Sequence, residues 1–156
     1  MAQNDLLKIG NQLCHPLYST TNTLMRLYKP LLASLNITYP QYLILMVLWE
    51  EDGINMNAVS ERTYFDSGTL TPLIKKLKQK GFIQIEVNKA DRRNKILFLT
   101  PKGQRLKTSA NAVPKSLMCF VPFSKEDTLN YMRMTRRLHK ALLDVEDKAG
   151  VIRHLP

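Results

Sequence analysis

The sequence predicts a mainly α-helical fold that carries one small β-hairpin, an α+β class. Apolar residues recur at helical spacing over most of the chain, and the period changes to two only between Phe82 and Thr100. Proline, glycine or asparagine separates the periodic segments. With 156 residues, 44% of them hydrophobic, the chain can bury a proper core, and we expect a single domain over residues 1–156.

Two helices are predicted in the first third of the chain. The first runs from about Pro16 to Leu35, where leucines lie at helical spacing, and the segment Asn36–Pro40 ends it. Thr38 can cap the second helix, with Pro40 in its first turn and an end near Glu51.

A short helix and an amphipathic helix follow. The short one spans roughly Met56 to Thr63, and Asp66 or Ser67 can cap the next after a turn. One apolar stripe then marks the longer helix, and Gly81 stands where a terminating glycine belongs. The stripe consists of Leu70, Leu73, Ile74 and Leu77, and the lysines off it are Lys75, Lys76, Lys78 and Lys80.

After Gly81 the pattern predicts two strands and then more helix. Residues 82–87 alternate and residues 95–100 form a second strand-like run, with a polar, charged connector between them. Thr100 caps the next helix, Pro114 and Pro122 break or kink the chain, and a last helix runs from about Ser124 to Asp147.

Short helix, turn, basic helix and hairpin, in that order, predict a winged helix-turn-helix at about residues 53–100. In such a unit the second helix enters the DNA major groove, and the hairpin tip reaches phosphates or an adjacent minor groove. The outer helices, about 6–35 and 101–148, have more apolar surface than this unit needs, so we expect them to form a homodimer on double-stranded DNA.

The charge pattern favours a polyanionic partner. The chain has 23 Lys and Arg against 13 Asp and Glu, and residues 75–107 contain eleven of the former and two of the latter. A solvated basic face is the alternative that charge alone leaves open. The longest apolar run has eight residues, against the roughly 20 of a membrane span, so a cytoplasmic protein without membrane contact is expected. Scattered His and Cys residues predict no metal site, and we expect no cofactor.

Four segments carry a family resemblance. Residues 66–77 closely resemble the recognition helix of MarR-type repressors, in particular the organic hydroperoxide resistance regulators, and residues 91–93 resemble the D-x-R signature of their wing. Residues 39–49 are similar to the second helix of the family, and residues 12–18 resemble its peroxide-sensing segment. The resemblance runs from about Leu6 to Asp147 and departs at His15-Pro16, where the family usually has Phe-Ala.

The resemblance implies a redox role for Cys14 and Cys119, supported by Tyr18, Tyr28 and Tyr39. Cys14 would be oxidised by an organic hydroperoxide, and Cys119 of the other subunit would trap it as a disulfide, or Cys14 would stay a sulfenic acid or mixed disulfide. If the first helix starts near His15, Cys14 lies at its N-terminus, where the helix dipole favours a thiolate. Without the family, Cys14 would be read as an inert buried thiol.

The residues expected to contact DNA lie on the basic helix and the wing. They are Ser67, Gly68, Thr69, Thr71, Pro72, Lys75, Lys76, Asp91, Arg92 and Arg93. Arg93 is the arginine that we expect to pair with Asp91 and brace the wing tip. The sequence thus predicts a redox-sensing repressor and no enzyme. A repressor that responds to a small aromatic ligand, with incidental cysteines, is the alternative, and a thiol peroxidase or oxidoreductase is a more distant one.

Overall fold

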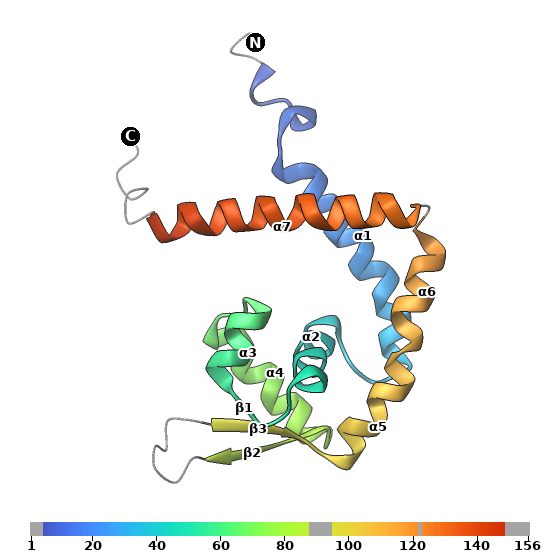
Figure 1. Ribbon diagram of the computed structural model, residues 1–156, viewed down its shortest axis with the longest axis vertical. Coiled ribbons are helices and arrows are strands. Elements are labelled where there is room, and N and C mark those ends of the chain that lie inside the picture. Colours follow the sequence, from blue (N-terminus) through green and yellow to red (C-terminus); the bar gives the residue numbers. More distant parts are fainter. Residues whose placement is uncertain (1–4, 88–94, 122, 149–156) are drawn as a thin grey trace. The chain divides into compact units, whose positions relative to one another are not determined.

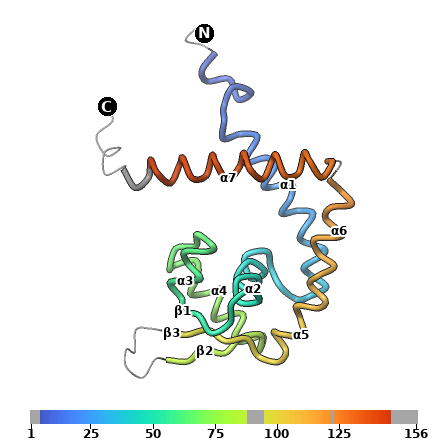
Figure 2. Tube along the Cα trace, in the orientation of Figure 1, coloured from blue at the N-terminus to red at the C-terminus, as the bar shows by residue number. Residues whose placement is uncertain are grey.

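The computed structural model describes residues 5–87, 95–121 and 123–148, and Figures 1 and 2 show its path. The chain divides into two compact units, Met1–Leu117 and Met118–Pro156. A short 3-10 helix, η2 (Ile9–Asn11), comes first in the larger unit. Of the described helices, none is long and apolar enough to cross a membrane.

Helices α1 (Cys14–Ala33) and α2 (Tyr39–Glu50) confirm the first two predicted helices, and α1 begins and ends two residues earlier than expected. Asn36 has a φ of 55°, in the left-handed region, so the chain turns sharply between them. Thr38 caps α2, and its backbone N–H donates to Gln41 Oε1 at 3.1 Å. Helix α2 is apolar on nearly all sides because it forms the centre of the core, where Ile44 and Leu45 are fully buried.

The helix-turn-helix consists of α3 (Met56–Thr63) and α4 (Ser67–Gln79), close to the predicted ranges. Asp66, rather than Ser67, caps α4, because its side chain accepts a hydrogen bond from the Thr69 backbone N–H at 2.8 Å. Gly81, with a φ of 73°, follows the last turn as predicted.

The sheet has three strands, where the sequence predicted a hairpin of two. Strands β2 (Ile83–Val87) and β3 (Lys95–Leu99) form the expected antiparallel hairpin. Strand β1 (Ile54–Asn55) pairs with the other edge of β3, which gives the order β1-β3-β2 (Figure 1). A strand of two residues is too short to show alternation, so the pattern could not reveal it.

Helices α5 (Pro101–Ala110) and α6 (Ala112–Phe120) continue the chain after the sheet. The break between them falls at Asn111 and not at Pro114, which lies in the first turn of α6, where a proline costs no hydrogen bond. The other predicted break, Pro122, lies outside the described residues. A groove between α1 and α6 is lined by Leu31 and Val113, so these two helices lie side by side (Figure 2).

The smaller unit consists of the end of α6 and helix α7 (Lys125–Lys148), close to the predicted last helix. Ser124 caps α7: its hydroxyl donates to Asp127 Oδ2 at 2.6 Å and accepts from the Asp127 backbone N–H at 3.0 Å. Helix α7 leaves large apolar side chains exposed, which are Leu129, Tyr131, Met132, Met134, Leu142 and Val145.

Candidate nucleic-acid interface and thiol site

Helix α4 exposes the residues that the sequence predicted to contact DNA. All of the predicted residues on this helix are exposed, which are Ser67, Gly68, Thr69, Thr71, Pro72, Lys75 and Lys76. Its opposite face is fixed in the core by Leu70, Ile74 and Leu77, each at most 2% exposed. Since the buried stripe leaves little freedom to rotate, the outward set is presented rigidly, as a groove-reading helix requires.

The first turn of α4 is held by side-chain hydrogen bonds. The Thr69 hydroxyl donates to Asp66 Oδ2 at 2.7 Å, and the Thr71 hydroxyl donates to the Ser67 carbonyl at 2.8 Å. The hydrogen bonds from the Thr69 side chain and backbone lower the pKa of Asp66. An ionised Asp66 therefore orders this turn, and each threonine hydroxyl, having donated its proton, can still accept a hydrogen bond.

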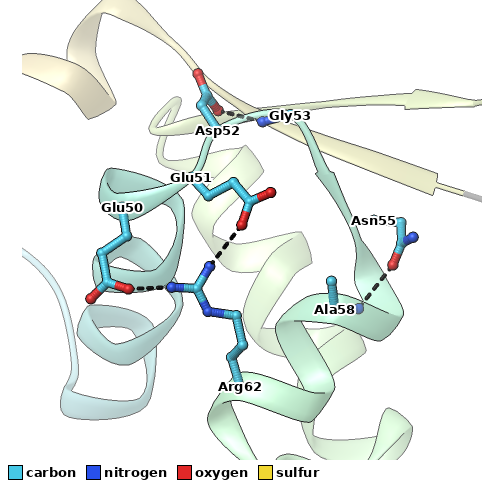
Figure 3. Close-up of polar contacts among 7 residues, drawn as sticks. All are labelled: Glu50, Glu51, Asp52, Gly53, Asn55, Ala58 and Arg62. Atoms are coloured by element: carbon cyan, nitrogen blue, oxygen red, sulfur yellow. Dashed lines mark hydrogen bonds and ion pairs between the residues drawn. The ribbon is translucent and has the colours of Figure 1, made fainter.

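Salt bridges join helix α3 to the end of α2. Figure 3 shows the Arg62 guanidinium between two carboxylates: it contacts Glu50 and lies 3.3 Å from Glu51 Oε2. In the same view Asn55 Oδ1 accepts from the Ala58 backbone N–H at 2.8 Å and so caps α3. The Arg62 contacts join α3 to the end of α2 at the surface, and the Asn55 cap closes the start of α3.

The predicted DNA-contacting residues of the wing lie at its tip, between β2 and β3. Asp91, Arg92 and Arg93 lie outside the described residues, so their expected DNA contacts and the expected Asp91–Arg93 pair stay predictions. The described strands lead to the tip, with Val87 opposite Lys95 as the last register pair. Asp52 Oδ1 accepts from the Leu99 backbone N–H at 2.8 Å and ties the far end of β3 to the start of β1.

Lys80 behaves differently from the other lysines of α4. Its Nζ donates to the Asn36 carbonyl at 2.7 Å and to Gln41 Oε1 at 3.1 Å, so it binds the loop between α1 and α2. The sequence grouped it with Lys75, Lys76 and Lys78 on a basic outer face, because helical spacing does not reveal which loop passes near the end of a helix.

The two cysteines are exposed and belong to different units. Cys14 is the first residue of α1, and Cys119 lies near the end of α6. Cys14 is therefore not buried within its own chain, which differs from the alternative of a buried core thiol; whether it reacts stays a prediction. Pro16 falls in the first turn of α1, so the unusual His15-Pro16 pair is accommodated without a break in the helix.

Two of the three predicted tyrosines lie together. The rings of Tyr28 and Tyr39 have centroids 4.8 Å apart, and Tyr42, which the sequence analysis did not single out, has its ring 6.4 Å from that of Tyr28. Burial, followed by the neighbouring Tyr39 and Tyr42, raises the pKa of Tyr28 to about 12, and burial also raises the pKa of Tyr39. Tyr18 stands apart from this cluster and is 69% exposed.

An apolar pocket with a volume of about 520 Å³, the tyrosine pocket, has Tyr39 in its lining. Met25 and Leu32 of α1 line one side, and Ile37, Tyr39 and Pro40 line the other. Within the described residues no group of three or more His, Cys, Asp or Glu side chains is arranged to hold a metal ion.

An exposed helix in a helix-turn-helix, followed by a hairpin whose tip is basic in sequence, defines a DNA-binding winged-helix protein. Comparison with known proteins places the chain more narrowly. The family model described as transcriptional regulator SarA/Rot matches residues 26–109. The organic hydroperoxide resistance transcriptional regulator of Bacillus subtilis is 42% identical over 123 residues, which cover 79% of this chain and 84% of that protein.

Solved structures agree with this match. The structure of reduced AbfR bound to DNA, a protein of Staphylococcus epidermidis, has a TM-score of 0.77 and 31% identity over 93% of this chain and 99% of that one. Disulfide-formed AbfR has a TM-score of 0.64 and 29% identity over 90% of this chain and 96% of the other. The chain belongs to the SarA/Rot family of MarR-type transcriptional regulators. The similar structures confirm the predicted fold. The family match confirms the predicted class, a transcriptional regulator and not an enzyme, and it contradicts the thiol peroxidase alternative.

Proposed function

We propose that the protein is a repressor whose reduced homodimer binds a pseudo-palindromic operator and leaves it when an organic hydroperoxide oxidises Cys14. The relationship to an organic hydroperoxide resistance regulator supports the oxidant, and the relationship to AbfR, solved reduced on DNA and as a disulfide, supports the two states. The protein would act in the cytoplasm, where thiols restore the reduced form.

The distance between Cys14 and the tyrosine pair formed by Tyr28 of α1 and Tyr39 of α2 is the observation that carries this proposal. Cys14 and Tyr28 lie fourteen residues apart on one helix, which is about 21 Å at a rise of 1.5 Å per residue. The Tyr28–Tyr39 pair therefore lies beyond reach of Cys14 in its own chain. A second copy, packed with its α1 start against this pair, would bring the two together, whereas Tyr18 lies one turn from Cys14 of the same chain.

The raised pKa values suit a role as hydrogen-bond donors. Because the pKa of Tyr28 is about 12 and that of Tyr39 is also raised, both phenols keep their protons at neutral pH. A protonated phenol can donate to a thiolate and stabilise it without supplying charge of its own. The pair would hold the Cys14 of the partner subunit in its nucleophilic form and in a fixed direction.

The oxidation is a two-electron step. The Cys14 thiolate attacks the outer oxygen of the hydroperoxide, the O–O bond breaks, and an alcohol leaves after taking a proton. Cys14 becomes a sulfenic acid. The Cys119 thiol of the other subunit then attacks this sulfur, which forms the disulfide and releases water. Disulfide geometry requires Cα atoms within about 6.8 Å, so formation of the bond selects one dimer geometry.

The change of dimer geometry would act on DNA through the spacing of the two α4 helices. The exposed residues from Ser67 to Lys76 would contact bases and phosphates in the major groove, and Arg92 and Arg93 would reach the adjacent groove or phosphates. Two such helices fit successive half-sites only at a spacing of one helical turn of DNA, roughly 34–36 Å. A disulfide that alters this spacing lowers affinity without touching the reading helices.

The test measures operator affinity by fluorescence anisotropy at one fixed salt concentration, with an operator taken from the DNA upstream of the gene. We expect a large loss of affinity after one equivalent of cumene hydroperoxide, and dithiothreitol should reverse it. Cys14→Ser should abolish the loss. In Cys119→Ser protein the oxidised Cys14 should stay a sulfenic acid or a mixed disulfide, because the partner thiol is absent. Affinity that is unchanged by the hydroperoxide in the wild type would refute the redox mechanism.

The apolar pocket beside Tyr39 favours one other function, a repressor released by a small aromatic ligand. Titration of the reduced protein with aromatic carboxylates, with operator affinity as the readout, separates the two. Release by such a ligand in Cys14→Ser protein would establish this alternative.

A further inference from the structure

The contact of Lys80 joins the end of the reading helix to the loop that precedes α2. Lys80 is the C-cap residue of α4, and its Nζ reaches across 44 positions of sequence to the Asn36 carbonyl and 39 positions to Gln41 Oε1. Its own carbonyl accepts from Lys102 Nζ at 2.7 Å, at the start of α5. The end of α4 is therefore held from two sides.

The loop that Lys80 binds is held by backbone and side-chain hydrogen bonds. Asn36 adopts a left-handed φ of 55°, and the Ile37 backbone N–H donates to the Leu32 carbonyl at 3.1 Å, which closes the end of α1. Gln41 is a buried polar residue, only 1% exposed. Its Oε1 accepts both from the Thr38 backbone N–H, at 3.1 Å, and from Lys80 Nζ, at 3.1 Å. One amide oxygen thus serves the start of α2 and the end of α4 together.

The same loop forms a wall of the tyrosine pocket. Ile37, Thr38, Tyr39 and Pro40 line the pocket, and the Tyr39 ring lies against the Tyr28 ring at a tilt of 51°. A displacement of Tyr39 displaces Thr38 and Gln41, because they belong to one capping box. Lys80 must then follow the amide oxygen or leave a buried acceptor with one partner fewer, which is unfavourable. Either response is felt at the end of α4.

We propose that Lys80 is a positioning residue that couples the tyrosine pocket to the reading helix, so that a change at Tyr39 alters how α4 is presented to DNA. This link acts inside one subunit, in addition to the change of dimer spacing. The event that moves Tyr39 in the cell, oxidation of Cys14, is taken from the proposed function. The link between Tyr39 and α4 rests only on the contacts of Lys80.

The experiment is a double-mutant cycle on the operator affinity of the full-length reduced protein, which needs no oxidant. It compares wild type, Tyr39→Leu, Lys80→Met and the double variant at one salt concentration, with circular dichroism to confirm that each is folded. We expect Tyr39→Leu to change the operator Kd of the wild type, and this change to be about fivefold smaller in the Lys80→Met background. Lys80→Arg, which keeps a charged donor, should retain the full effect of Tyr39→Leu.

Lys78→Met is the matched control, because Lys78 lies two residues earlier on the same helix, is exposed, and carries the same charge. It should shift the operator Kd of both members of the cycle equally. The proposal would be overturned if Tyr39→Leu changed the operator Kd by the same factor with and without Lys80→Met. It would also be overturned if Tyr39→Leu left the operator Kd unchanged. If Lys80→Met does not fold, Lys80→Gln, whose shorter side chain cannot span both acceptors, replaces it.

A second measurement separates this proposal from the redox mechanism. The ratio of operator Kd after and before cumene hydroperoxide should be smaller in Lys80→Met than in Lys78→Met. If the hydroperoxide leaves the operator Kd of the wild type unchanged while the double-mutant cycle shows coupling, the redox mechanism is refuted and the link through Lys80 is supported. If the wild type responds and the cycle shows independent effects, the link fails and the redox mechanism stands.

Discussion

Replacement of Gly103 by alanine should destabilise the protein, although alanine is the better helix former. Gly103 lies in the first turn of α5, where the helix passes close to the Phe82 backbone just before β2. A Cβ atom at this position would lie 2.1 Å from the Phe82 carbonyl oxygen and 3.1 Å from Leu99 Cδ2, where ordinary contact begins at 3.4 Å. Helix α5 must therefore move away from the strand by more than about 1 Å, since the obstacle is backbone.

The magnitude follows from opposing terms. Alanine gains ~1 kcal/mol of helix propensity over glycine. Overpacking of this kind costs about 1–3 kcal/mol. The shift also strains two hydrogen bonds worth ~1 kcal/mol each: Trp49 Nε1 donates to the Gly103 carbonyl at 3.0 Å, and the Thr100 hydroxyl donates to the Gly81 carbonyl at 2.6 Å. We expect a net loss of ~2 kcal/mol in the free energy of unfolding.

Urea unfolding followed by the fluorescence of Trp49, the single tryptophan, measures this loss at one fixed protein concentration. The midpoint should fall by ~1 M. Gly10→Ala is the control, because a Cβ there meets nothing within 4 Å, and its midpoint should change little. A Gly103→Ala protein as stable as the wild type would show that α5 does not press on the sheet as described.

Three further outcomes are expected. Because the folded chain holds the Tyr28 proton up to a pKa of about 12 while the unfolded chain releases it near 10, stability is full below pH 10 and falls as pH rises towards 12. In urea unfolding at a series of pH values, Tyr28→Phe should make this loss of unfolding free energy smaller by ~1 kcal/mol. The value is reduced from the full pKa difference because the ring is half exposed to solvent. Lys75→Ala and Lys76→Ala should each reduce the slope of log affinity against log salt by about 1, and unchanged slopes would show that they do not contact phosphates. Arg62→Met should cost less than ~1 kcal/mol of unfolding free energy, because its two carboxylate partners are 71% and 67% exposed; a loss above ~2 kcal/mol would contradict this reasoning.

Local chemistry explains why the helix boundaries could be predicted. Thr38, Asp66 and Thr100 each cap the helix that follows, and a capping side chain acts within three residues of itself. Gly81 likewise ends α4 through its own backbone conformation. Such signals lie entirely within a short stretch of sequence, so they could be recognised without the fold.

Features that depend on distant segments could not be predicted in this way. Strand β1 exists because β3 offers it a free edge, and its two residues carry no pattern of their own. The inward role of Lys80 depends on a loop some 40 positions earlier. For the site, the exposed residues of α4 could be predicted from helical spacing. The family resemblance indicated Tyr28 and Tyr39 as thiol-supporting residues, but their contact with each other and with Tyr42 depends on the packing of α1 against α2 and was not predicted.

Strand β1 also protects the wing against unwanted association. A lone hairpin has two open edges, and an open edge is a template for strands of other chains. Here Ile54 and Asn55 occupy the outer edge of β3, and they lead at once into α3, so a further strand cannot align along that side. The edge of β2 carries the exposed polar side chains Gln84 and Glu86, which disfavour stacking of a second sheet. These two strand residues thus lower the risk that β3 pairs with strands of other chains.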